Sequence, residues 1–137
     1  MFSRRGFLFV VPVIVPGAVD ALLTLAGQPS EYWSGNFSAS REWNPLGRIL
    51  LQQHPLLFAG IAFAWVGLVS LAILRLPLRL AAVLSFVVML VHALCGACWL
   101  WRLGPIGIVL AIAYLVLVER IWSVVWRRHN ALISPAA

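Results

Sequence analysis

The chain has 137 residues, of which 63% are hydrophobic and only 10% are charged, well below the ~25% charged share of an average soluble domain. Its mean hydropathy of +0.98 argues against a soluble globular protein and predicts a single integral membrane domain over residues 1–137. The net charge is +6, but the basic residues are scattered at the ends of apolar stretches. Nucleic acid binding, which needs one basic patch, is therefore not expected.

Four apolar stretches occupy most of the chain, and each is close to the ~20 residues that a helix needs to cross ~30 Å of hydrocarbon. They are Phe7–Ala26, Pro55–Leu74, Leu80–Trp101 and Pro105–Trp122. The expected fold class is therefore an all-α membrane protein in which four transmembrane helices form an antiparallel bundle.

The arginines predict how these helices are oriented, because basic residues favour the cytoplasmic side of a membrane. Most of the ten flank one side of the predicted bundle, namely Arg4, Arg5, Arg75, Arg79, Arg120, Arg127 and Arg128. Both termini are therefore expected in the cytoplasm. An all-arginine basic set is typical of a GC-rich bacterial genome, so the expected location is the bacterial cytoplasmic membrane. Four tryptophans near helix ends are expected to anchor the chain at the two interfaces: Trp99, Trp101, Trp122 and Trp126.

The connections between helices differ in length. Arg75–Arg79 and Arg102–Gly104 are short, so the last three helices are expected to pack as consecutive antiparallel neighbours. The connection over residues 27–54 has 28 residues, far more than the usual ~4–6. This outer loop is a candidate partner-binding segment, with Tyr32, Trp33, Glu42, Trp43 and Asn44 as its candidate residues.

Asn44-Pro45 within this loop is a typical helix start, because Asn caps free N–H groups and Pro suits the first helical position. It predicts a short interfacial helix over residues 45–53 that lies on the membrane surface. The alternative is that the second long helix begins early and bends at Pro55.

Ionisable residues inside a membrane are costly and are usually functional. At 1.5 Å per residue, Asp20 lies ~20 Å and His92 ~18 Å from the same side of the bundle, so the two side chains are expected at one level. Thr24 lies further out, and Glu42 and His54 are candidates to close the cluster from the loop. Glu119 is expected near the opposite interface.

The segment that follows His92 contains Cys95 and Cys98 on the same broad face of a helix. One interpretation is close helix packing through small residues. A second is thiol redox chemistry, since a Cys-x-x-Cys pair in a four-helix bundle resembles the quinone-linked disulfide-forming enzymes, including vitamin K epoxide reductase relatives. Those enzymes generally use a second cysteine pair, whereas this chain has two cysteines in total. A third is a metal or haem site that combines His92 with Asp20, Cys95, Cys98 or His54.

Two short motifs carry a further resemblance. Asp20-x3-Thr24, followed by Glu42-Trp43-Asn44-Pro45, resembles an uncharacterised family of small prokaryotic membrane proteins with Asp-x3-Thr and Glu-x-Asn-Pro signatures. The similarity covers residues 18–57. It implies roles for Glu42 and Asn44 but no particular chemistry.

The expected function is that of a non-catalytic accessory or structural subunit, which packs against partner helices of a larger membrane complex or against further copies of itself. No cofactor is predicted, although the apolar helices suit contact with lipid, quinone or pigment. Two alternatives stay open. One is an outer-leaflet thiol-redox or metal-dependent enzyme that uses Cys95, Cys98, His92 and Asp20. The other is a small oligomeric transporter that uses Asp20 and His92.

Overall fold

The computed structural model describes residues 4–133, and the side chains of residues 6–131. Within these residues every regular element is a helix. Four helical stretches are long and apolar enough to cross a membrane, namely Gly6–Ala26, Pro55–Arg75, Leu78–Trp101 and Pro105–Ala131. The predicted all-α class and the four helices of membrane-spanning length are thus confirmed.

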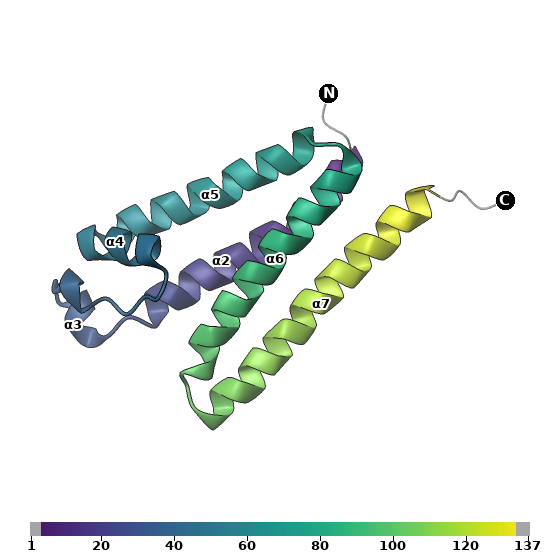
Figure 1. Cartoon of the computed structure of the whole chain (residues 1–137). Helices are drawn as coiled ribbons and strands as arrows, with labels where there is room; N and C mark the ends of the chain where they lie inside the picture. The colour runs from purple at the N-terminus through teal and green to yellow at the C-terminus, as the bar shows by residue number, and fades with distance from the viewer. Residues whose placement is uncertain (1–3, 134–137) are drawn as a thin grey trace.

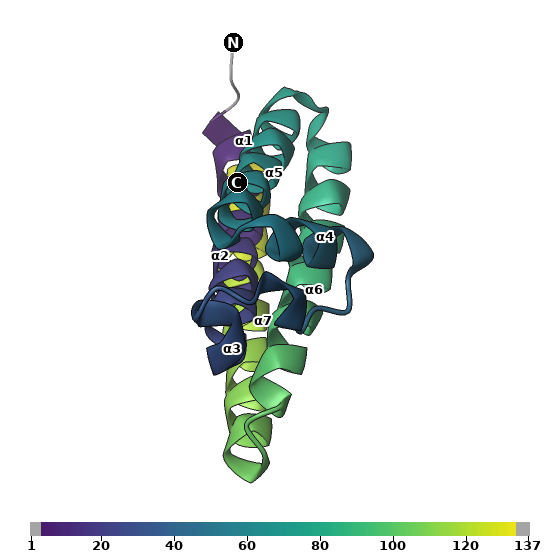
Figure 2. The ribbon, with the colours of Figure 1, turned by 90° about the vertical axis from the view of Figure 1, so that its left-hand side faces the viewer.

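The long helices run in alternating directions, and α1 lies at the same end of the molecule as the end of α7 (Figure 1). In chain order the elements are α1 (Arg4–Leu8), α2 (Val11–Ala26), α3 (Ser30–Trp33), η1 (Phe37–Ala39), α4 (Pro45–Gln53), α5 (Pro55–Arg75), α6 (Leu78–Trp101) and α7 (Pro105–Ile133). Figure 2 shows α3 and α4 across the ends of α2 and α5, while the turn between α6 and α7 lies away from them.

The first span consists of two helices, α1 and α2, because Pro12 has no backbone N–H to donate to the last turn of α1, whereas Pro16 lies inside α2. Hydrogen bonds at the break join residues three apart instead of four, as in a 3₁₀ turn. For example, the Val13 N–H donates to the Val10 carbonyl at 3.1 Å. The Ser85 hydroxyl of α6 donates to the Phe9 carbonyl at 2.6 Å. A neighbouring helix therefore satisfies a backbone group at the break, as a membrane interior requires.

The α2 helix lies against both α5 and α6, and its contact with α6 is the most extensive in the molecule. A side chain at Gly17 would come within 2.8 Å of Val66 in α5 and 3.9 Å of His92 in α6, so this glycine lets α2 approach both helices. The α6 and α7 helices pack as the short connection predicted. By contrast, α5 and α6 meet near their turn and then diverge (Figure 1).

The last helix is longer than the apolar stretch from which it was predicted. That stretch ends at Trp122, whereas α7 continues to Ile133. No Pro or Gly follows Trp122 before that point, so nothing in the chain ends the helix where the hydropathy falls. The extension carries Trp126, His129 and Asn130 alongside the start of α6.

Candidate functional site

Asp20 and His92 form the polar centre of the bundle. Asp20 lies on α2 and His92 on α6, and their Oδ2 and Nδ1 atoms are 2.8 Å apart. The side chains are 16% and 19% exposed, respectively. Because a carboxylate only accepts hydrogen bonds, Nδ1 carries the shared proton when Asp20 is ionised. The prediction that the two residues share a level is confirmed, and the bond joins the two helices that contact each other most.

The two cysteines lie close to this pair without joining it. Both are free thiols with exposed side chains on α6. Cys95 follows His92 by three residues, about one turn of α6. Cys95 and Cys98 therefore lie on an outer surface of the bundle, on the helix that carries His92, where their small side chains suit helix packing.

Tyr114 is a polar neighbour that the sequence analysis missed. Its ring lies against Gly96 of α6, where an added Cβ would be 3.2 Å from the hydroxyl oxygen. The hydroxyl is buried and has no hydrogen-bond partner among the residues that the structure describes. Its position within the last apolar stretch is the signal that could have identified it, since a buried Tyr usually finds a partner for its hydroxyl.

The structure brings together only two of the residues considered for a metal site, Asp20 and His92. Among residues 4–133, no three His, Cys, Asp or Glu side chains lie close enough to hold a metal ion. His54 lies outside the bundle, where its Nδ1 accepts a hydrogen bond of 3.2 Å from the Leu56 N–H and caps α5. Thr24 is buried on α2, and its carbonyl accepts a hydrogen bond of 2.7 Å from the Gln28 side chain.

Gln28 holds the start of the outer loop against its middle, and sequence reasoning did not single it out. Its side chain is buried, and its Oε1 accepts a hydrogen bond of 2.8 Å from the Arg41 backbone N–H. Tyr32 is also fully buried, and its hydroxyl donates to the Leu51 carbonyl at 3.1 Å. Burial raises the pKa of Tyr32 above its usual range. Tyr32 therefore belongs to the core of the loop and not to its exposed surface.

The exposed part of the loop carries Trp33 and Trp43. The guanidinium group of Arg102 lies 4.0 Å from the centre of the Trp99 ring and 5.6 Å from that of Trp43. These contacts hold the loop against the end of α6. A cleft of about 470 Å³ opens here, lined by Ser40, Arg41, Glu42, Trp43, Arg48 and Arg102.

Glu42 and Asn44 both stabilise the start of α4. Glu42 Oε1 accepts a hydrogen bond of 2.7 Å from the Asn44 N–H. Asn44 Oδ1 in turn accepts one of 3.1 Å from the Leu46 N–H, which makes Asn44 the N-cap of α4. The Glu-x-Asn-Pro motif thus has a local structural role, because its polar side chains satisfy backbone groups of their own turn.

Tryptophans lie at both ends of the bundle. Trp99 and Trp101 are at the end of α6 beside the loop, and Trp101 is exposed. Trp122 and Trp126 lie on α7 toward the end that carries α1, and their rings stack at 5.9 Å.

Comparison of the chain with protein-family models, with curated proteins and with solved structures gives no match.

Proposed function

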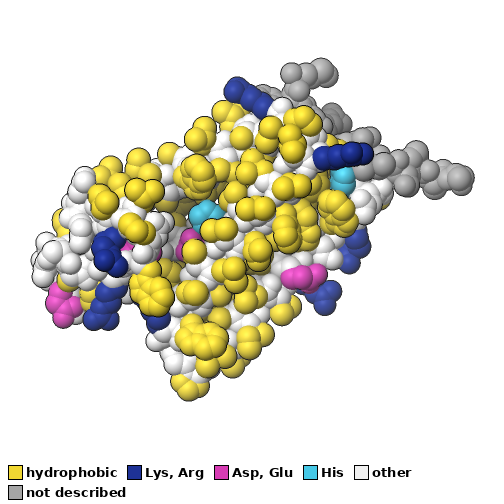
Figure 3. Space-filling view, in the orientation of Figure 1, with side chains coloured by type: hydrophobic (Ala, Val, Ile, Leu, Met, Phe, Trp, Pro, Cys, Tyr) yellow, Lys and Arg dark blue, Asp and Glu magenta, His cyan; other side chains and the backbone are white. Residues whose placement is uncertain are grey.

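We propose that this chain is a non-catalytic integral membrane subunit whose α5 helix packs against a helix of a larger membrane complex. The least enclosed of the four spans is α5: 17% of its apolar segment is buried within the chain, against 44% for the first span. Figure 3 shows the wider pattern, with hydrophobic side chains over most of one face and basic side chains toward its ends.

The observation that carries this proposal is a face of small residues on α5. Gly60, Ala64 and Gly67 recur at intervals of four and three residues, so they share one side of the helix. All three are exposed, and a Cβ added at Gly60 or Gly67 would meet nothing within 4 Å. Small residues let membrane helices approach closely and are enriched where helices pack.

Glycines elsewhere in the spans show what such positions do in this protein. Gly17 receives Val66 of a neighbouring helix, and Gly96 receives the ring of Tyr114. In both places the missing side chain is what lets two helices touch. The small-residue face of α5 offers the same opportunity to a helix from another chain.

The chain is also assigned an orientation in the membrane. Both termini are assigned to the cytoplasmic side of a bacterial cytoplasmic membrane, and α4 to the opposite membrane surface. The exposed Trp33 and Trp43 are then available to a partner outside the membrane. These assignments are supported by the arginine distribution and by the exposed apolar residues Leu46 and Ile49 on α4.

A matched pair of substitutions tests the role of α5. Ala64→Leu adds bulk to the small-residue face, whereas Ala113→Leu adds the same bulk to an exposed position on α7. Purified from native membranes in mild detergent, the wild type and Ala113→Leu should travel with a larger complex, and Ala64→Leu should elute without it. Elution of the wild type as a lone, stable monomer, or equal retention of the two variants, would contradict the proposal.

The hydrogen-bonded Asp20–His92 pair supports a second candidate, a small oligomeric proton transporter, because acidic and histidine side chains form proton relays in membranes. Asp20→Asn should then abolish proton flux into proteoliposomes, while Glu119→Gln, which changes an exposed carboxylate, should leave it intact. Equal flux for the wild type and Asp20→Asn would remove this candidate.

A further inference from the structure

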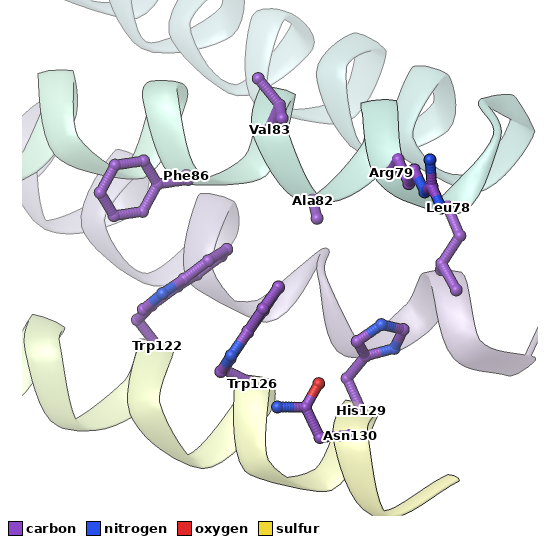
Figure 4. Close-up of a pocket in the computed structure, with 9 residues that line it drawn as sticks. All are labelled: Leu78, Arg79, Ala82, Val83, Phe86, Trp122, Trp126, His129 and Asn130. Carbon is purple, nitrogen blue, oxygen red and sulfur yellow. The ribbon is translucent and has the colours of Figure 1, made fainter. Parts of the chain in front are cut away.

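A groove of about 670 Å³ lies between α6 and α7, at the end of the molecule that carries α1. The part of the groove farther from the start of α6 is apolar and aromatic. The Trp122 ring contacts Phe86 at a centroid distance of 5.1 Å and stacks on Trp126 with 20° between their planes. Figure 4 shows the two indoles side by side along α7, with Ala82 of α6 leaving space opposite them. The shape suits a long, flexible apolar chain.

The part of the groove at the start of α6 is polar and basic. Arg79 of α6 and His129 and Asn130 of α7 line it, and no carboxylate occurs among the lining residues that the structure describes. Arg79 and Phe86 are seven residues apart on α6, so the polar part lies ~10 Å along the helix from the aromatic part. The groove is therefore amphipathic along its length, with its basic end toward the start of α6.

His129 provides an independent indication of a ligand. Its side chain is 7% exposed, yet no side chain or backbone group that the structure describes forms a hydrogen bond with its Nδ1. A buried polar atom without a partner costs ~1–3 kcal/mol, and such atoms are rare in folded proteins. The imidazole packs edge-on against Phe9 at 5.1 Å, and Figure 4 shows it pointing into the groove.

We propose that this groove binds an anionic phospholipid. One acyl chain lies along Phe86, Trp122 and Trp126, and the headgroup phosphate lies between Arg79 and His129. A proton on Nδ1 donates to a phosphate oxygen, and Arg79 supplies the positive charge. Basic pockets between membrane helices recognise anionic headgroups in this way. This single occupant accounts for both features, because its phosphate provides the missing partner of His129 Nδ1 and its acyl chain fills the separate aromatic part.

Quenching of tryptophan fluorescence by lipids with brominated acyl chains tests the proposal. The full chain is reconstituted in phosphatidylcholine vesicles, into which increasing fractions of brominated phosphatidylglycerol or brominated phosphatidylcholine are mixed. Trp122 and Trp126 lie in the groove, and a double Trp→Phe variant at these positions measures the background from the other tryptophans. For the wild type, half-maximal quenching should need about fivefold less brominated phosphatidylglycerol than brominated phosphatidylcholine, as expected for one basic contact of ~1 kcal/mol.

Three variants identify the headgroup contacts. Arg79→Gln removes the charge at the groove, and His129→Phe removes Nδ1 while keeping a ring against Phe9. Each should reduce the preference for phosphatidylglycerol to near unity. Arg127→Gln changes an exposed arginine of α7, the helix that carries His129, and Arg127 does not line the groove. This variant should keep the preference for phosphatidylglycerol.

Equal quenching of the wild type by the two lipids would overturn the proposal, as would an unchanged preference in both Arg79→Gln and His129→Phe. A loss as large in Arg127→Gln would assign the preference to general surface charge, which also overturns it. Displacement of the brominated lipid by soluble glycerol phosphate would show that the site takes a free phosphate group and not a membrane lipid.

Discussion

Breaking the bond between Asp20 and His92 should destabilise the bundle more than removing any exposed ion pair. Both side chains are largely buried, so replacing one of them with Ala leaves the other without solvent or a partner. A buried pair broken on one side typically costs 3–5 kcal/mol in soluble proteins. Interhelical hydrogen bonds in membranes are worth less, ~0.6–2 kcal/mol, because the unfolded chain in lipid also finds partners. Truncation adds the loss of packing around the shortened side chain.

These contributions predict a loss of about 2 kcal/mol for Asp20→Ala and about 2 kcal/mol for His92→Ala. The double variant has no unpaired group left, and so should lose only about 2.5 kcal/mol, which corresponds to a coupling energy of about 1.5 kcal/mol. Unfolding of the purified full chain by increasing dodecyl sulfate in mixed micelles, followed by tryptophan fluorescence, measures each free energy of unfolding.

Glu119→Ala is the matched control. The Glu119 carboxylate is 63% exposed and 3.7 Å from the Arg120 guanidinium, so its removal should change stability by less than ~0.5 kcal/mol. Additive losses in the double variant, with a coupling energy near zero, would refute the view that this pair ties α2 to α6.

Two other predictions use the same unfolding measurement. Ser85→Ala removes the 2.6 Å hydrogen bond to the Phe9 carbonyl and should cost about 1.5 kcal/mol. Ser70→Ala, whose hydroxyl bonds only within its own helix, should cost much less, and equal losses would contradict the explanation. Burial raises the pKa of Tyr32, so the neutral phenol is favoured in the folded state. Its stabilising contribution is therefore complete below the unfolded pKa of ~10 and is lost as the pH rises through the higher folded value. Tyr32→Phe should lower stability by about 1 kcal/mol at pH 7, through loss of the bond to Leu51. It should also reduce the further loss between pH 9 and 12, and an unchanged alkaline profile would count against this assignment.

The spans and the common depth of Asp20 and His92 could both be predicted because they depend on distances along the chain. Hydropathy locates helices of membrane-spanning length, and a fixed rise per residue gives the depth of each side chain. The lateral arrangement depends instead on which side each helix turns toward its neighbours. Because the apolar residues of α5 and α6 are spread around all sides of each helix, their sequences contain no stripe that specifies a buried face. The insertion of α2 between them at Gly17 was therefore not predicted.

Contacts made by polar side chains outside the motifs were missed for a related reason. Gln28 binds the backbone of Arg41 in the middle of the outer loop, but nothing in the sequence around Gln28 specifies a partner 13 residues away. His129 lies beyond the point at which the last apolar stretch was expected to end. Only the continuation of α7 as a helix brings this residue beside α6, where it lines the groove.

The buried polar groups of the bundle differ in whether the chain itself satisfies them, and this difference separates structural sites from binding sites. Asp20 and His92 satisfy each other, and Ser85 satisfies the backbone at the break in the first span. Within the part of the chain that the structure describes, the Tyr114 hydroxyl and His129 Nδ1 have no such partner, and His129 also lines the groove beside Arg79. The free energy cost of burying His129 Nδ1 without a partner is offset if a molecule from outside the chain supplies the missing hydrogen bond. The groove at His129 is therefore a stronger candidate for ligand binding than the hydrogen-bonded Asp20–His92 pair at the centre of the bundle.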